Sequence, residues 1–311
     1  MKYNFFPFCF FNGKIVEFES AKVSVATKAL QYGMAVFGGI RGYYRKDLSG
    51  VYVFRISDHY KRFLNSLKIL GVKFPYSAKE LIDITVSLIK KNSSKSNFYL
   101  RPFAYADSLG LSPNFAVDSD FNFTLYMLPL EEYLSINKGL RVKVSSFRRV
   151  ADNAIPSRAK ISGAYVNSAL ASKEAYDNNC DEAIFLTEDG HIAEGSAENL
   201  FIVRNNRLIT PPVSDDVLEG ITRDTILTLA QRLGIEVEVR SIDRTELYVC
   251  DEAFFCGTGV QVSWIKEIDR RVIGNGKIGK ITKALQELYF NVVQGFDEEA
   301  ESWRTFVSLK K

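Results

Sequence analysis

The stretch from Pro129 to Gly139 divides this chain of 311 residues into two parts with similar patterns. Before it, strand-like runs surround helix-like runs; after it, strands, a long helix, hairpins and another helix begin again. A chain of 311 residues suits about two domains of ~150 residues each. We therefore expect a small N-terminal α+β domain over residues 1–130, a connector over 131–139 and a larger C-terminal domain over 140–311.

The first part is typical of an α+β unit, in which helices cover one face of a largely antiparallel sheet. One helix is predicted from about Asp58 to Leu70, with Ser57 as its N-cap and Gly71 at its end. A second begins at Ser77, because Glu80 three residues later completes a capping box. Strand patterns fall at Phe8 to Phe18, Val51 to Phe54, Phe98 to Tyr105 and Phe121 to Met127.

The second part continues this mixture of helices and strands. A strand is predicted at Leu140 to Ser146, and helices at Ser162 to Asn178 and Arg223 to Leu233, the latter stopped by Gly234. Ala183 to Thr210 is predicted to be a series of hairpins, and Lys280 to Gln294 a terminal helix.

Composition excludes several classes of protein. Hydrophobic residues make up 46% and charged residues 25%, which is ordinary for a soluble fold. The sequence contains no run of ~18 apolar residues, the length that a membrane helix needs. Four cysteines without a CxxC pair indicate a reducing cytoplasm. Two histidines and no Gly-x-Ser-x-Gly motif argue against a metal site or a serine hydrolase. The net charge of +3 is dispersed, so no nucleic-acid partner is implied.

Lys160 and Glu194 are the first candidates for chemistry. Lys160 lies among small residues, and a lysine so placed can form an imine with a carbonyl cofactor. Glu194 follows the hairpin signal Asp189-Gly190, so a strand edge or loop would present its carboxylate, which can keep a ring nitrogen protonated. Taken singly, each residue is more often an ordinary surface charge.

Two short segments could bind anions. Gly220-Ile221-Thr222-Arg223-Asp224 lies where a loop becomes a helix, so the amides of Ile221 and Thr222 would face a phosphate. The simpler alternative is a glycine turn with Thr222 as N-cap. Gly257-Thr258-Gly259, after an apolar strand, offers further amides and a hydroxyl, or forms a plain turn.

Gly274 to Gly279 fits the GxGxxG pattern of a dinucleotide site. Only 32 residues (311 − 279) follow it, too few for the rest of a nucleotide-binding half. We expect a glycine-rich turn into the last helix.

Many segments, taken in order, make the chain similar to the fold-type IV aminotransferases that use pyridoxal phosphate, and most similar to the branched-chain amino acid aminotransferases. The resemblance covers nearly the whole chain. Its segments are Phe11-Asn12-Gly13, Tyr32 to Phe37, Gly39-Ile40-Arg41, Tyr99-Leu100-Arg101-Pro102, Lys160, Glu194-Gly195, Glu198-Asn199-Leu200-Phe201, Thr210-Pro211-Pro212, Leu218 to Arg223 and Cys256-Gly257-Thr258.

The resemblance implies pyridoxal 5'-phosphate as cofactor. Lys160 would hold it through a Schiff base and carry a proton between substrate and cofactor carbons, and Glu194 would pair with the pyridine nitrogen. Tyr165 would hydrogen-bond the ring hydroxyl and Leu218 would pack on the ring. The phosphate would be bound by Arg62, Gly220, Ile221, Thr222 and Thr258.

The resemblance also implies a substrate site and a reaction. The substrate carboxylate would lie against Tyr99 and the amides of Thr258 and Gly259. The side-chain pocket would be shaped by Tyr32, Phe37, Arg101 and Tyr133, of which Tyr32, Arg101 and Tyr133 offer a polar wall for the second carboxylate of 2-oxoglutarate. The implied enzyme is a cytoplasmic homodimer that transfers the amino group of L-leucine, L-isoleucine or L-valine to 2-oxoglutarate.

Several positions depart from the family pattern and concern the substrate side. The family usually has Phe-Glu-Gly-Ile-Arg where this chain has Phe37-Gly38-Gly39-Ile40-Arg41, so that Gly38 replaces the glutamate. It usually has Trp at the position of Leu130, and Thr-Ala-Ala-Glu where this chain has Thr258-Gly259-Val260-Gln261. A D-amino acid aminotransferase, an amine transaminase or an aminodeoxychorismate lyase of the same fold therefore stays open. A nicotinamide oxidoreductase and a non-catalytic anion-binding protein are the alternatives outside this fold.

Overall fold

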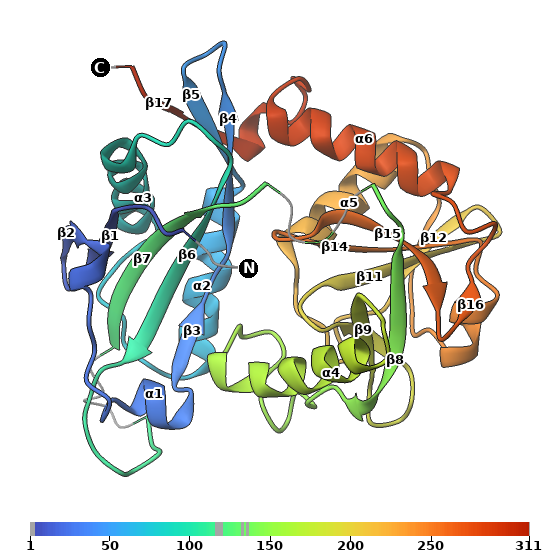
Figure 1. The fold of residues 1–311 in the computed structure, drawn as a ribbon, viewed down its shortest axis with the longest axis horizontal. Coiled ribbons are helices and arrows are strands. Elements are labelled where there is room, and N and C mark those ends of the chain that lie inside the picture. The colour runs from blue at the N-terminus through green and yellow to red at the C-terminus, as the bar shows by residue number, and fades with distance from the viewer. Residues whose placement is uncertain (1–3, 116–120, 132–133, 135–136, 311) are drawn as a thin grey trace. The chain divides into compact units, whose positions relative to one another are not determined.

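The computed structural model describes residues 4–115, 121–131, 134 and 137–310 (Figure 1). Tyr133, predicted to line the substrate pocket, lies outside the described residues. The chain forms two compact units: the first comprises Met1–Glu131, Ala159–Gly163 and Asn291–Lys311, and the second comprises Glu132–Arg158 and Ala164–Phe290. Each unit has its own sheet and its own core.

Within the described residues, the first unit is built on an eight-stranded sheet with the order β17-β5-β4-β6-β7-β1-β2, and β3 pairs with β6. All the recorded strand pairs are antiparallel, which confirms the predicted α+β unit. The strands are β1 (Phe8–Phe11), β2 (Lys14–Glu17), β3 (Ala35–Phe37), β4 (Ile40–Arg45), β5 (Gly50–Phe54), β6 (Phe98–Ala106), β7 (Phe121–Pro129) and β17 (Arg304–Ser308). The helices are α1 (Lys28–Tyr32), α2 (Ile56–Ile69) and α3 (Ala78–Asn92), with short 3-10 turns at Phe18–Ser20 and Glu301–Trp303.

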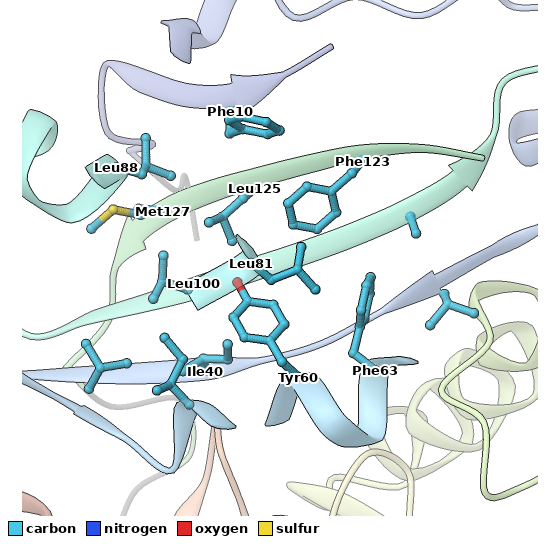
Figure 2. Packing of buried hydrophobic residues seen from close by; sticks show 14 of the residues in the cluster. Phe10, Ile40, Tyr60, Phe63, Leu81, Leu88, Leu100, Phe123, Leu125 and Met127 are labelled. Atoms are coloured by element: carbon cyan, nitrogen blue, oxygen red, sulfur yellow. The ribbon is translucent and has the colours of Figure 1, made fainter. Parts of the chain in front are cut away.

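The core of this unit lies between the sheet and the helices α2 and α3. Figure 2 shows Tyr60 and Phe63 pointing from α2 into it, and the Phe63 ring meets Phe123 of β7 edge-on with centroids 6.0 Å apart. Alternate residues of β6, such as Leu100, enter the same core. Because successive side chains of a strand point to opposite faces, the half-buried Tyr99 and Arg101 occupy the other face.

The two long helices of this unit begin in different ways. Ser77 caps α3 in the predicted capping box, with its backbone N–H donating to Glu80 and its hydroxyl accepting from the Glu80 N–H. The predicted helix near residues 58–70 is confirmed as α2, but Ser57 as its N-cap was wrong, because α2 starts at Ile56 and Ser57 already lies inside its first turn. The residue before it, Arg55, takes a left-handed conformation (φ 48°) and donates its N–H to the carbonyl of Trp303.

The second unit is built, within the described residues, on a nine-stranded mixed sheet with the order β10-β9-β8-β15-β14-β11-β12-β13, and β16 pairs with β15. Its parallel pairs are β8 with β9, β8 with β15 and β12 with β13. The strands are β8 (Leu140–Arg148), β9 (Glu182–Leu186), β10 (Ile192–Gly195), β11 (Asn199–Arg204), β12 (Arg207–Thr210), β13 (Val237–Val239), β14 (Glu252–Gly257), β15 (Gln261–Ile268) and β16 (Arg271–Val272).

The predicted helices of this half of the sequence are confirmed, with small shifts at their ends. They are α4 (Tyr165–Asp177), preceded by a 3-10 turn at Ser162–Ala164, α5 (Ile221–Arg232) and α6 (Lys280–Gln294); a further 3-10 turn covers Arg244–Tyr248. Gly274 and Gly276 lie in the turn before α6 with positive φ, as expected for that glycine-rich segment.

The predicted series of hairpins from Ala183 to Thr210 is only partly right. β9 pairs with β10, and β11 pairs with β12, as hairpins. Between them the chain leaves the edge of the sheet, because β11 pairs with β14 and not with β10. The short turn from Gly195 to Asn199 therefore leads to a different part of the sheet, and Glu194 and Asn199 lie on either side of it.

Among the described helices, none has the length and apolar character needed to cross a membrane.

Candidate active site

Lys160 belongs to the short segment Ala159–Gly163 of the first unit, which runs beside β3. The carbonyl of Lys160 accepts a hydrogen bond from the Phe37 N–H at 3.0 Å, and its own N–H donates to Ser66 Oγ at 3.2 Å. Its Nζ lies 5.2 Å from the centre of the Phe37 ring. Both polar atoms of the main chain are thus fixed, while the amine is held over an aromatic face.

Helix α2 supplies the neighbours of this lysine. Ser66 Oγ also donates to the carbonyl of Arg62 at 3.0 Å, so one buried hydroxyl links the turn that carries Arg62 to the main chain of Lys160. His59 is 5% exposed. Its pKa lies well below the ordinary value, first because of burial and then because of the nearby cations Arg62, Arg55 and Lys160. The imidazole is therefore neutral at pH 7.

The predicted substrate residues of the first unit form a stack. The guanidinium carbon of Arg101 lies 4.6 Å from the centre of the Phe37 ring and 5.1 Å from that of Tyr99. A guanidinium packed against aromatic rings is restrained, and it can bind a carboxylate through two parallel hydrogen bonds. Tyr32, on α1, is 38% exposed and donates its hydroxyl to the carbonyl of Leu111 at 2.7 Å.

The departure at Gly38 has a structural reason, whereas nothing in the structure explains leucine at position 130. A Cβ on Gly38 would lie 2.7 Å from Cγ of Pro102, so the local packing leaves no space for a larger residue. Leu130 is buried, and its carbonyl accepts a hydrogen bond from Arg41 Nη2 at 2.8 Å. Gln261, the third departure, is buried at the start of β15 and has a positive φ of 59°.

Glu194 is the residue before last of β10 in the second unit, where it is buried and held by charged and neutral donors. Its Oε1 pairs with Nη2 of Arg149 at 3.0 Å. Its Oε2 accepts from Asn199 Nδ2 at 3.0 Å and from the Leu218 N–H at 3.1 Å. A carboxylate so restrained points in one direction, as a partner for a ring nitrogen must.

The start of α5 has the geometry expected of an anion site. The helix begins at Ile221 with Gly220 as N-cap, so Thr222 lies inside the first turn and the alternative with Thr222 as N-cap is wrong. Gly220 offers no side chain to cap the first amides, and a Cβ there would lie 1.9 Å from Oδ1 of Asn199. Only glycine fits this position. An anion here would accept hydrogen bonds from the backbone N–H groups of Ile221 and Thr222.

Three further predicted residues of this unit lie at the start of a helix or in a turn between strands. Tyr165 is the first residue of α4 and is half-buried. Thr258 and Gly259 lie in the turn between β14 and β15, which is enclosed by the paired residues Gly257 and Gln261.

The structure adds residues that the sequence did not single out: Ser66 and His59 beside Lys160, and Arg149 beside Glu194. Arg149 carried no signal, because it lies at the end of a strand among other basic residues. Asn199 was part of a segment similar to the family, yet nothing there indicated its bond to Glu194.

Comparisons with known proteins agree with this arrangement. Residues 36–268 match the family described as amino-transferase class IV. The chain belongs to that family.

Relatives of this class IV aminotransferase carry a more specific name. A probable branched-chain-amino-acid aminotransferase of Aquifex aeolicus (strain VF5) is 46% identical over 96% of both chains. The crystal structure of the branched-chain aminotransferase of Thermoproteus uzoniensis with norvaline has a TM-score of 0.93 and 41% identity, covering 96% of this chain and 99% of that one. The T.th. branched-chain amino acid aminotransferase, complexed with N-(5'-phosphopyridoxyl)-L-glutamate, has a TM-score of 0.92 and 37% identity over 99% of both chains.

These likenesses confirm the fold-type IV architecture and the resemblance to branched-chain aminotransferases. This class IV aminotransferase is accordingly a member of the branched-chain group, which is a group of pyridoxal-phosphate-dependent transferases.

Proposed function

We propose that this class IV aminotransferase moves the amino group of L-leucine, L-isoleucine or L-valine to 2-oxoglutarate with pyridoxal 5'-phosphate as cofactor. The observation that carries the proposal is 46% identity over 96% of the chain to a probable branched-chain-amino-acid aminotransferase. The phosphopyridoxyl-glutamate bound to the T.th. enzyme supports both the cofactor and glutamate as the product of the second half-reaction.

The residues of this chain fit the cofactor. Glu194 is a buried carboxylate aligned by Arg149 and Asn199, as a protonated pyridine nitrogen requires. Gly220 and the first turn of α5 suit a phosphate, because oriented amides and the positive end of the helix dipole favour a dianion. Lys160 supplies the amine, and we assign Arg62, Tyr165, Leu218 and Thr258 to the remaining contacts with the same cofactor.

Pyridoxal phosphate, when bound, supplies an electron sink that makes the α-hydrogen of an amino acid acidic. Lys160 Nζ would take that proton from the substrate carbon and deliver it to the cofactor carbon, while the hydrogen bonds of Phe37 and Ser66 fix the main chain that carries this side chain. Glu194 keeps a proton on the ring nitrogen, because its ionised carboxylate is the acceptor of that N–H. The Phe37 ring beneath Nζ excludes water from one side of the amine.

Substrate recognition is assigned to the residues that the resemblance implies. Tyr99 and the amides of Thr258 and Gly259 bind the α-carboxylate. Phe37 offers an apolar surface to a branched side chain, and Arg101 offers a planar cation to the second carboxylate of 2-oxoglutarate. We assign the same role to Tyr32 and to Tyr133, as the resemblance implies.

A panel of L- and D-amino acids with 2-oxoglutarate as acceptor tests the proposal. We expect turnover with L-leucine, L-isoleucine and L-valine at least ~10-fold above that with the D-isomers, since the reaction depends on one face of the bound substrate. A preference for D-alanine or for simple amines would replace the proposal by one of the other activities of this fold. Lys160→Ala is the matched control for background transfer.

We also propose that the enzyme is a cytoplasmic homodimer. An exposed apolar patch on the first unit supports the dimer: Val25, Leu30, Leu109 and Leu111 are between 62% and 82% exposed. The loop around Leu109 joins the segment before α1 through a bridge to Thr27 and through the bond of Lys28 N–H to the Ser108 carbonyl. A connected apolar surface of this kind is typical of a subunit interface.

A further inference from the structure

Arg149 and Glu194 form an ion pair buried inside the second unit. Nη2 of Arg149 lies 3.0 Å from Oε1 of Glu194, and their side chains are 10% and 7% exposed. The Arg149 main chain is fixed by the bond of its N–H to the Leu186 carbonyl at 2.8 Å. The guanidinium also lies 5.9 Å from the centre of the Phe185 ring. The guanidinium is thus packed in place, which distinguishes this pair from a flexible surface ion pair.

The same guanidinium reaches the segment that leads to α5. Nε of Arg149 donates to the carbonyl of Asp216 at 3.3 Å. Two residues further on, the Leu218 N–H donates to Glu194 Oε2, and the Leu218 carbonyl accepts from Asn199 Nδ2. Arg149 therefore contacts both the carboxylate and the chain that enters the first turn of α5, whereas Asn199 provides a neutral version of the same connection.

We propose that Arg149 is a positioning residue that keeps Glu194 ionised and aimed at the cofactor ring. This inference rests on the proposed function, because it gives Glu194 its role as the partner of the ring nitrogen. Arg149 itself touches neither substrate nor cofactor in this proposal and acts only through Glu194.

The charge of Arg149 decides where one proton resides. Burial favours the neutral form of a carboxyl group, and the neutral donors Asn199 and Leu218 N–H offset this only in part. The adjacent guanidinium carries a full positive charge, which favours the ionised form and lowers the proton affinity of Glu194. Without Arg149, the carboxyl group would keep the proton that should remain on the ring nitrogen. Arg223 on α5 also interacts with the Glu194 charge, and it is left unchanged in all the variants below.

Thermal unfolding of the full-length chain freed of cofactor tests the charge coupling without any turnover. The cycle comprises the wild type, Arg149→Gln, Glu194→Gln and the double variant, each between pH 5 and pH 8. In Arg149→Gln the folded-state pKa of Glu194 is expected above its unfolded value of about 4.3. Stability linked to that group is then present at low pH and lost as pH rises through the folded pKa.

The melting temperature of Arg149→Gln should lie below that of the wild type, and we expect this difference to be roughly 5–10 °C larger at pH 8 than at pH 5. Adding Glu194→Gln should remove this extra loss. Equal pH profiles for Arg149→Gln and the double variant would overturn the proposal. If Arg149→Gln alone does not fold, a folded double variant supports the coupling and an unfolded one contradicts it.

The holoenzyme tests the consequence for the reaction. Arg149→Gln should lower the rate constant of the half-reaction with L-leucine about 10-fold or more, with little change in KM, and Arg149→Lys should restore a large part of it. Arg148→Gln changes the neighbouring, exposed arginine and should react like the wild type. An unchanged rate in Arg149→Gln would show that Glu194 needs no charged neighbour. Because the unfolding cycle requires no transamination, failure of the proposed activity and failure of this inference remain distinguishable.

Discussion

At the level of single residues, the main chain of Lys160 is fixed by partners that lie far from it in sequence. Ser66 Oγ accepts from the Lys160 N–H and donates to the Arg62 carbonyl, so a single hydroxyl serves both residues. Phe37 holds the carbonyl of the same lysine. The position of the Lys160 main chain therefore depends on α2 and β3 as well as on the segment 159–163.

Replacing Ser66 by Ala should weaken this arrangement. The Lys160 N–H would lose its acceptor in a buried place, which costs about 1–3 kcal/mol. We expect a lower free energy of unfolding in urea and faster loss of pyridoxal phosphate on dialysis. Ser87→Ala is the matched control, because Ser87 makes the same kind of bond to the carbonyl of Asp83 on an exposed helix face. Equal stability and equal retention of pyridoxal phosphate in the two variants would show that Ser66 has no role in positioning Lys160.

At the level of elements, the junction of β3 and β4 explains a departure from the family pattern. Gly38 donates its N–H to the carbonyl of Pro102 and packs on the ring of that proline. Because a Cβ would lie 2.7 Å from Pro102 Cγ, Gly38→Ala should destabilise the protein by about 1–3 kcal/mol through overpacking. Chemical denaturation measures this directly. A variant as stable as the wild type would mean that β3 shifts freely and that the glycine reflects substrate preference instead.

Elements whose signals are local could be predicted from the sequence. The capping box of Ser77 and Glu80 lies within four consecutive residues and correctly indicated the start of α3. The start of α2 could not be predicted in this way, because Arg55 owes its conformation to the carbonyl of Trp303 near the other end of the chain. The predicted hairpin series was wrong between Gly195 and Asn199 for a similar reason, because β11 pairs with β14, which is distant in the sequence.

The candidate site divides along the same line. Lys160, Glu194 and the Gly220 turn were indicated by their chemistry and by resemblance to a family, and their roles stay predictions. Arg149 could not be found in this way, because its ion pair joins residues brought together only by folding. Residue type and spacing identify groups that react, whereas the groups that orient them depend on tertiary contacts.

At the level of the whole molecule, the proposed homodimer should have about twice the mass of the 35.1 kDa chain, close to 70 kDa (2 × 35.1). Leu111→Asp should shift the protein towards the monomer in analytical ultracentrifugation, because a charge would be buried in an apolar interface. Tyr176→Asp is the control, since Tyr176 is similarly exposed on α4 of the second unit. A wild-type protein that sediments as a monomer at micromolar concentration would contradict the dimer.

The central claim is that the whole chain works as a branched-chain aminotransferase through Lys160. The most direct test is the absorption spectrum of the protein loaded with pyridoxal phosphate, recorded on adding L-leucine and then 2-oxoglutarate. We predict that L-leucine converts the yellow form to one absorbing at shorter wavelength, that 2-oxoglutarate restores it, and that Lys160→Ala does neither at a comparable rate. A spectrum that L-leucine leaves unchanged, or a Lys160→Ala variant that cycles as fast as the wild type, would contradict the account.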